Sequence, residues 1–382
     1  MVARHARSDA GSAHRRVRWF MVASMGAVLA VVVSLTLTLR GSGDTTSTTA
    51  TTTSTPTPST TTTVAVANVT LSAVGDTELG DTPKLPANAS TYFAPVRAAL
   101  AAPIEFANLE GTMTNATASK CGASSSDCYA FRVPPAYAHI YRAAGFDVLN
   151  SANNHSHDFG TQGLVETSAA LRAAGIVQAG LPGQIGVVRE GTTKVAFVDF
   201  APYANTNNLL DFTTAAHLIK RARSEAKLVV VYMHAGAEGS GADHVTRASE
   251  YYVGENRGNP YAFAHAAIVD GADLVIASGP HVLRGMQFFR GHLIAYSLGD
   301  FDNYYDFSSS GTLAMSAILH VTLTPTGKYV TGRFTSLLLS TAGQATIDPR
   351  HAAASFVNGL SRQDFAATAA LVSPNGIIAP PR

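Results

Sequence analysis

Short apolar segments and amphipathic segments alternate along most of this chain. The apolar, β-rich segments predict strands, and the segments with apolar residues at helical spacing predict helices. The predicted strands cover residues 67–75, 104–111, 146–152, 194–202, 227–236 and 272–278. The predicted helices between them cover residues 91–102, 134–145, 165–175, 215–226 and 262–271. This alternation favours an α/β architecture with a largely internal sheet.

The C-terminal part of the chain has a different pattern. Residues 293–299, 316–324 and 328–339 predict strands, and no helical segment separates the last two. Residues 354–371 then predict an amphipathic helix that packs on the domain. A sandwiched sheet flanked by helices accounts for both parts of the pattern.

The N-terminal residues differ from the rest in composition. Residues 1–19 are rich in arginine and predict a cytoplasmic tail, and residues 20–39 form an uncharged run long enough to cross a membrane as a helix. Residues 40–65 are rich in Thr, Ser and Pro and predict a stalk without a packed core. We therefore expect a single-pass anchor that holds residues 66–382, one α/β domain, outside the membrane. A cleaved signal peptide is the alternative, but the apolar run is longer than usual and no Ala-x-Ala site follows it.

Composition narrows the classes of function. Of the 382 residues 46% are hydrophobic, which is enough to bury a substantial core. Only 14% are charged and the formal net charge is +1, so we expect no nucleic-acid partner. Cys121 and Cys128 lie close together in CGASSSDC and predict a local disulfide outside the membrane. Two free or metal-binding thiols are the alternative.

Polar side chains directly follow five of the predicted strands. They are Asp76, then Asn108 and Glu110, then Asn153, Asn154, His155 and Asp158, then His234 and Glu238, and finally His281. The carboxyl ends of strands in an α/β sheet meet at one edge, where ligands bind. Carboxylate, amide and imidazole donors without thiolates suit divalent Mn, Fe, Zn or Mg ions. Each cluster alone is compatible with a polar turn, but residues 151–160, SANNHSHDFG, carry more polar groups than a turn requires.

Five ordered segments resemble the CapA family of capsule synthesis proteins. AVGDTELG, FANLEGTMT, LNSANNHSHDFG, MHAGAEG and GADLVIASGPHVLRGMQFFRGHLIAYSLGDF occur in the family's order and with roughly its spacing, from about Val69 to about Leu371. The family is associated with synthesis or export of poly-γ-glutamate capsule and is related to the calcineurin-like metallophosphoesterases. The resemblance implies a metallophosphoesterase-like α/β/β/α sandwich, preceded here by the N-terminal transmembrane helix.

The same resemblance implies roles for individual residues. The positions that match the family's divalent-metal ligands are Asp76, Glu110, Asn154, His234 and His281. His155 would stabilise charge or donate a proton to the leaving group. We add Asp158 and Glu238 as catalytic candidates because they also follow strands. The predicted substrate contacts are Asn108, Glu255, Arg257 and Arg284. Glu255 and Arg257 lie in a Gly-rich loop suited to an acidic substrate, and a surface ion pair is the alternative reading of the two.

Two positions depart from the family pattern. Ser278 stands where the first His of Gly-His-Gly-Pro-His lies, and Asp300 replaces the Asn of Ser-Leu-Gly-Asn-Phe, so a site with one metal or none is also compatible with the sequence.

We expect a membrane-anchored, extracytoplasmic protein that handles an anionic cell-surface polymer such as poly-γ-glutamate, with other capsule synthesis or export subunits as partners. Metal-dependent hydrolysis or transfer is the expected chemistry. The alternatives are a non-enzymatic polymer- or partner-binding subunit and an exported metal-dependent phosphoesterase.

Overall fold

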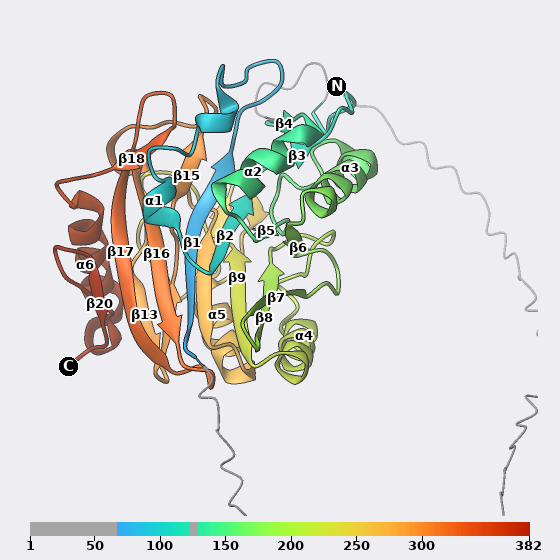
Figure 1. Cartoon of the computed structure of the whole chain (residues 1–382). Coiled ribbons are helices and arrows are strands. Elements are labelled where there is room, and N and C mark those ends of the chain that lie inside the picture. The colour runs from blue at the N-terminus through green and yellow to red at the C-terminus, as the bar shows by residue number, and fades with distance from the viewer. Residues whose placement is uncertain (1–66, 122–127) are drawn as a thin grey trace, which may run out of the picture. The chain divides into compact units, whose positions relative to one another are not determined.

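Two β-sheets lie face to face in the computed structural model, which describes residues 67–121 and 128–382 (Figure 1). The larger sheet has ten strands, which are β1 (Val69–Glu78), β2 (Ile104–Leu109), β5 (Val148–Asn150), β6 (Val177–Ala179), β15 (Asp300–Asn303), β16 (Met315–Leu323), β17 (Tyr329–Leu339), β18 (Ala345–Ile347), β19 (Leu371–Val372) and β20 (Ile377–Ala379). The smaller sheet has six strands, which are β7 (Gly186–Glu190), β8 (Thr193–Phe200), β9 (Leu228–His234), β12 (Leu274–Ser278), β13 (Met286–Phe289) and β14 (His292–Ala295). Two small pairs complete the strands, namely β3 (Thr112–Met113) with β4 (Arg132–Val133) and β10 (Tyr251–Tyr252) with β11 (Glu255–Asn256).

Both sheets combine parallel and antiparallel pairing. In the larger sheet β1, β2, β5 and β6 are parallel neighbours in that order, and β16 pairs with β1 in the antiparallel sense. In the smaller sheet β8, β9, β12 and β14 are parallel, while β7 and β13 form antiparallel edges. The parallel strands therefore place their carboxyl ends at one edge of each sheet, as the sequence predicted.

Helices cover the outer face of each sheet. The six α-helices of the described residues are α1 (Arg97–Leu100), α2 (Ala138–Ala144), α3 (Gly160–Ala173), α4 (Phe212–Glu225), α5 (Pro260–Asp270) and α6 (Ala352–Phe365). The first three share a buried cluster with the larger sheet, and α4 and α5 share one with the smaller sheet. Helix α6 contributes Ala353, Ala354 and Val357 to the core between the sheets. The layers thus follow the order helix, sheet, sheet, helix, and the predicted α/β class is confirmed.

Strand residues alternate between the two faces that each sheet buries. On β2, Phe106 points into the core between the sheets and its neighbour Ala107 belongs to the cluster under the helices. The Phe106 ring stacks on Phe197 of the other sheet, with ring centroids 5.3 Å apart. Burying each such side chain contributes about 1.5–3 kcal/mol, so these contacts hold the two sheets in register.

The predicted helix over residues 91–102 is mostly wrong. Only a 3₁₀ turn (Ala89–Thr91) and the four-residue helix α1 form there. Pro95 lies in the middle of the predicted segment, where it lacks the N–H group that a helix needs and disfavours helical geometry in the preceding residue. The other predicted helices and the predicted strands all appear, with shifted ends.

The predicted membrane anchor, residues 20–39, and the predicted stalk, residues 40–65, lie outside the described residues. Within residues 67–121 and 128–382, none of the helices combines the length and the apolar character that crossing a membrane requires.

Candidate functional site

Strand pairing brings the polar residues of both sheets together. On the larger sheet Asp76 lies opposite Asn108 of β2 and also opposite Asp300 of β15. On the smaller sheet Ser278, the last residue of β12, lies opposite His234, the last residue of β9. The two sets meet directly, because the backbone N–H of Gly279 donates to Asp76 Oδ2 at 3.1 Å.

A glycine allows this close approach on the larger sheet. The backbone N–H of Asp76 donates to the carbonyl of Gly299 at 3.0 Å. A Cβ atom on Gly75 would overlap with that same carbonyl oxygen. Gly75 therefore fixes the position of Asp76 beside Asp300, because a side chain there would push β1 and β15 apart.

Two groups of donor atoms in the site could hold metal ions. One consists of Asp76, His281 and Asp300, and the other of Asp76, Glu110 and His234, each with its ligand atoms within 4.8 Å of one another. Asp76 belongs to both groups. His281 Nδ1 lies 2.8 Å from Asp300 Oδ1, and His234 Nδ1 lies 3.6 Å from Glu110 Oε2. The donors are carboxylates and imidazoles, the groups that bind divalent transition metals.

Asn108 connects the two carboxylates of the second group. Its Nδ2 donates to Asp76 Oδ1 at 2.6 Å and also to Glu110 Oε2. Its Oδ1 accepts from Asn150 Nδ2 at 2.6 Å and from Asn153 Nδ2 at 2.8 Å. The Asn108 side chain is fully buried. Asn108 therefore positions the carboxylates of Asp76 and Glu110. This role differs from the substrate contact that was predicted for Asn108.

Several donor atoms face the site without a partner. Among the described residues, Glu110 Oε1, Asn154 Oδ1 and His234 Nε2 are buried and make no hydrogen bond. Buried polar atoms normally have partners, because leaving one unpaired costs about 1–3 kcal/mol. A carboxylate oxygen, an amide oxygen and an imidazole nitrogen are all metal ligands, so these residues fit a bound divalent ion.

Burial and neighbouring charge shift the pKa values of these donors. Burial raises the pKa of Asp76 to about 6, although His281 and two hydrogen bonds oppose the shift. Burial and the charge of Asp76 raise the pKa of Glu110 well above its usual value. Burial, with Arg257 nearby, lowers the pKa of His234 far below its usual value, so this imidazole is neutral, as a metal ligand must be.

His281 is shifted in the opposite direction from His234. Burial alone would lower its pKa, but Asp300, Asp76 and Glu238 outweigh burial and raise it to about 10. Without a metal ion this ring therefore carries a proton that offsets the surrounding carboxylates. The His281 ring also stacks on Phe307, with centroids 4.4 Å apart.

His155 and Asp158 form a hydrogen-bonded pair beside the donors. His155 Nδ1 lies 2.8 Å from Asp158 Oδ2, and its Nε2 lies 3.9 Å from Glu110 Oε1. Burial lowers the pKa of His155, and Asp158 partly restores it. Asp158 thus orients the ring, so that Nε2 is the atom free for proton transfer.

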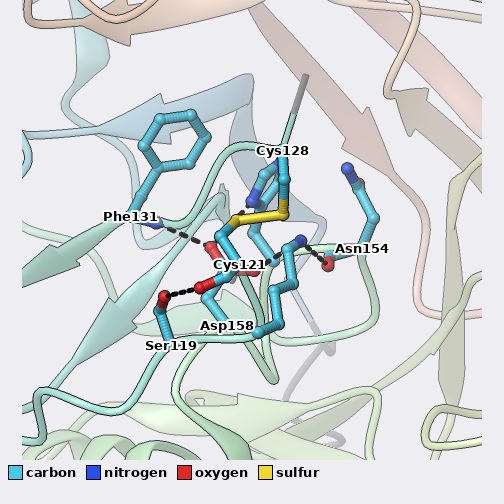
Figure 2. The surroundings of a disulfide bond; sticks show 8 residues. Ser119, Cys121, Cys128, Phe131, Asn154 and Asp158 are labelled. Atoms are coloured by element: carbon cyan, nitrogen blue, oxygen red, sulfur yellow. Dashed lines mark hydrogen bonds and ion pairs between the residues drawn. A yellow bond between two sulfur atoms is a disulfide. The ribbon is translucent and has the colours of Figure 1, made fainter. Parts of the chain in front are cut away.

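The predicted disulfide between Cys121 and Cys128 is confirmed, and Figure 2 shows it near Asp158. Lys120, which precedes Cys121, places its Nζ 2.6 Å from Asp158 Oδ1 and 3.1 Å from the carbonyl of Asn154. The backbone N–H of Phe131 donates to Asp158 Oδ2 at 2.7 Å. The segments on both sides of the disulfide therefore contact both carboxylate oxygens of Asp158 and hold this side chain in place.

The donors open into a cavity of about 660 Å³. Its walls include the catalytic candidates His155 and Glu238 and the metal candidates Asn154 and His281. Charged and aromatic side chains complete the lining, among them Lys120, Tyr129, Tyr252, Glu255, Arg257 and Phe307. A cavity of this size accommodates a short polymer segment or a small molecule.

Comparison with protein families identifies the chain. The family described as "Bacterial capsule synthesis protein PGA_cap" matches residues 70–305, which include every donor described above. The chain belongs to the PGA_cap family. The CapA resemblance expected from the five sequence segments is therefore confirmed.

Two curated relatives of this PGA_cap domain carry related names. "PGA biosynthesis protein CapA" of Bacillus subtilis (strain 168) is 30% identical over 179 residues, which cover 42% of this chain and 44% of the relative. "Capsule biosynthesis protein CapA" of Bacillus anthracis is 28% identical over 182 residues, which cover 42% and 41%. The aligned region thus spans less than half the length of each of these relatives.

Solved structures with a distant likeness to the PGA_cap domain include two nucleotidases. The NAD nucleotidase NadN of Haemophilus influenzae has a TM-score of 0.37 and 12% identity, covering 74% of this chain and 54% of that one. A 5'-nucleotidase precursor from Thermus thermophilus has a TM-score of 0.39 and 14% identity, covering 74% and 56%. Likeness at this distance carries no information about activity.

The structure shows what the two departures from the PGA_cap pattern do. Ser278 donates its hydroxyl to Asp76 Oδ1, so the position holds a hydrogen-bond donor where an imidazole was expected. Asp300 bonds His281 and adds a carboxylate to the first donor group. Relative to the family pattern, the site therefore lacks an imidazole nitrogen at position 278 and has an additional carboxylate oxygen at position 300.

The predicted residues fall into three sets. The five predicted metal ligands and the three predicted catalytic residues converge on one region, as described above. Two predicted substrate contacts, Glu255 and Arg257, line the cavity. Arg284 does not belong to the cavity lining found among the described residues. It is buried, with Nη2 2.7 Å from Glu250 Oε2 and Nε donating to the carbonyl of Ala242 at 2.7 Å, so the structure gives it an internal role.

Sequence reasoning missed Lys120, Asn150 and Phe307. Asn150 is the last residue of β5, so the same strand-end rule could have found it. Lys120 and Phe307 lie in loops and reach the site only through the tertiary fold, and no local pattern marks them.

Proposed function

We propose that this chain is a membrane-anchored, extracytoplasmic capsule synthesis protein that acts on an anionic cell-surface polymer, poly-γ-glutamate or a similar chain, by metal-dependent hydrolysis or transfer. The observation that carries the proposal is the set of buried donor atoms without partners in the described structure, Glu110 Oε1, Asn154 Oδ1 and His234 Nε2, next to the His155 ring. Membership of the PGA_cap family and the names of the Bacillus relatives support the choice of polymer.

The donor chemistry supports a divalent ion. Oxygen donors would come from Asp76, Glu110, Asn154 and Asp300, and nitrogen donors from His234 and His281. A set this rich in oxygen favours Mn or Mg, and the two imidazoles also allow Fe or Zn. When bound, such an ion polarises a carbonyl or phosphoryl oxygen and lowers the pKa of water.

The protein's own residues would manage protons and orientation. With Nδ1 donating to Asp158, His155 can accept or give a proton at Nε2 as the scissile bond breaks. Glu238 lies between Arg257 and His281, with its carboxylate 2.6 Å from Arg257 Nη1 and 3.8 Å from His281 Nε2. It would position these two cations in the cavity wall.

The proposed location outside the membrane rests on two features. Residues 20–39 form the uncharged run that predicts an anchor, with arginines before it. The only two cysteines of the chain form a disulfide, which persists in oxidising compartments. Other capsule synthesis or export subunits would be partners at the membrane.

Metal content is the first test. Elemental analysis of the purified full-length chain, loaded with Mn or Zn, is expected to give stoichiometric metal in wild type and a loss in H234A. H244Q is the matched control, because His244 pairs with Asp364 away from the donor groups and its loss should leave the metal content unchanged. Absence of metal from wild type under these conditions would refute metal-dependent chemistry and leave the polymer-binding role.

Substrate choice is the second test. The metal-loaded protein should cleave or transfer poly-γ-glutamate or γ-glutamyl peptides, and H155A should abolish this activity while retaining metal. Activity confined to phosphoesters would instead establish an exported phosphoesterase. Inactivity on all three classes would refute the catalytic part of the proposal.

A further inference from the structure

One buried arginine in the cavity wall has spare hydrogen-bonding capacity. Arg257 is 1% exposed and lines the cavity. Its Nη1 donates to Glu238 Oε1 at 2.6 Å. Its Nε and Nη2 are buried and have no partner among the described residues. A buried guanidinium rarely leaves donors unused, because each was hydrogen-bonded to water in the unfolded chain.

The two unused donors lie on the same edge of the guanidinium plane. Nε–H and one N–H of Nη2 point in parallel, and this edge matches the two oxygens of a carboxylate or of a phosphate. The Nη1 donor that Glu238 occupies lies on the other side. Glu238 therefore fixes the plane of the guanidinium and leaves its bidentate edge for a ligand.

The surroundings of Arg257 connect it to the donors of the proposed metal site. Glu238, which accepts from Arg257 through Oε1, has its Oε2 3.8 Å from Nε2 of the donor residue His281. Asn154, His155 and His281 line the same cavity. Lys120, which pairs with Asp158, adds a second cation to the lining. An anion held by Arg257 would thus lie in the cavity that contains the reacting groups.

A second buried arginine shows what a purely structural role looks like in this protein. Arg284 is also 1% exposed, but it donates to Glu250, to the carbonyl of Ala242 and, at 3.4 Å, to the carbonyl of Ala237. All three of its nitrogen atoms are in use. Arg257 is equally buried, but only one of its three nitrogen atoms makes a hydrogen bond. This difference between the two arginines points to a ligand at Arg257.

We propose that Arg257 binds a carboxylate or phosphate group of the substrate through its Nε–Nη2 edge, so that the site selects molecules with such an anion close to the bond that reacts. The proposal rests on the proposed function for the identity of that bond. On a γ-linked glutamate chain the anion would be the free α-carboxylate beside the γ-amide. On a phosphorylated substrate it would be a phosphate oxygen pair.

Binding of small probes to the full-length protein tests this directly. Isothermal titration calorimetry would measure the binding of three probes, each in EDTA and again with Mn²⁺. The probes are γ-glutamyl-glutamate, the analogue in which the α-carboxylate beside the γ-amide is replaced by a carboxamide, and inorganic phosphate. R257K keeps the charge but removes the planar fork, and R284K is the matched control. Thermal unfolding of each variant reports whether it is folded.

For R257K we expect affinity for the γ-glutamyl dipeptide to fall on the order of 10- to 100-fold, because two charge-assisted hydrogen bonds lose their geometry. R284K should keep wild-type affinity, even if its unfolding temperature falls. On wild type alone, the α-carboxamide should bind more weakly than the carboxylate by a similar factor, which tests the proposal even if R257K fails to fold. If phosphate, and not the dipeptide, shows the dependence on Arg257, the anion is a phosphate.

Two results would overturn the inference. One is equal affinity of wild type and folded R257K for every probe, and the other is failure of wild type to bind any of the anions. The proposed function can fail independently of this inference. If anions bind in EDTA in a way that depends on Arg257, but the protein neither takes up metal nor turns over substrate, the Arg257 site is supported and the catalytic proposal is wrong.

Discussion

Asn108 allows a strict test of whether the site is built for a cation. Its Nδ2 separates two carboxylates, Asp76 and Glu110, by donating to both. N108D keeps the shape of the side chain but replaces this donor with an oxygen. Three carboxylate groups would then face one another in a fully buried position.

The size of the effect follows from the bonds that are lost. Hydrogen bonds to charged groups contribute about 1.5–3 kcal/mol each, so losing both should lower the free energy of unfolding by about 3–6 kcal/mol without metal. A divalent ion bound to the same carboxylates would offset their repulsion and stabilise the native state by an amount that rises with the logarithm of its concentration relative to Kd. The deficit of N108D should therefore shrink markedly when Mn²⁺ is present.

Urea unfolding in EDTA and in millimolar Mn²⁺ measures both quantities. N207D is the matched control, because the buried Asn207 donates Nδ2 only to backbone carbonyls, those of Asp199 at 3.0 Å and Gln184 at 3.1 Å. The loss in free energy of unfolding caused by N207D should be the same in EDTA and in Mn²⁺. If the deficit of N108D is equally independent of Mn²⁺, or is below about 1 kcal/mol, the reasoning about a cation between Asp76 and Glu110 is wrong.

Three further predictions concern individual residues. Asp199 is buried without a partner among the described residues, and burial raises its pKa well above the usual value, so it holds its proton in the folded state while the unfolded state ionises. Asp199 should then make the free energy of unfolding fall as pH rises above about 4, by up to about 1.4 kcal/mol per pH unit, and D199N should make the measured slope shallower by up to that amount in urea unfolding at pH values of about 4.5, 5.5 and 6.5. D158N should lower turnover by about 10²- to 10⁴-fold with unchanged metal content, as a pH–rate profile and elemental analysis would show, since His155 loses the carboxylate that orients it. S278H should raise Zn²⁺ affinity at least about tenfold in a chelator competition, because it adds an imidazole beside Asp76, and an unchanged affinity would contradict the assignment of this position.

The convergence of the candidate side chains could be predicted from the sequence because of how parallel strands pair. Asp76 lies near the carboxyl end of β1, His234 ends β9 and Asn154 follows β5, and parallel pairing within each sheet brings such ends together. This rule needs only the strand pattern, which local periodicity supplies. It does not say which atom each side chain presents, so Asn108 was interpreted as a substrate contact when it bridges two carboxylates.

Residues that reach the site from loops could not be predicted in the same way. Lys120 approaches Asp158 because the segment beside the disulfide folds back over the turn after β5, and that path depends on tertiary packing. Arg257 and Arg284 were both predicted to contact substrate. Only the structure distinguishes them, because Glu250 and two carbonyl groups engage Arg284.

The division of donors between the sheets explains why the departure at Ser278 matters. The larger sheet supplies the oxygen donors, Asp76, Glu110 and Asp300, and the smaller sheet supplies the imidazoles of His234 and His281. A bound ion would therefore bridge the two sheets. In its absence Ser278 and Gly279 of the smaller sheet donate to Asp76 and make that connection themselves. Compared with the histidine of the family pattern, a serine at this position offers no imidazole to an ion, but its hydroxyl forms a direct hydrogen bond between the sheets that holds Asp76 in place without one.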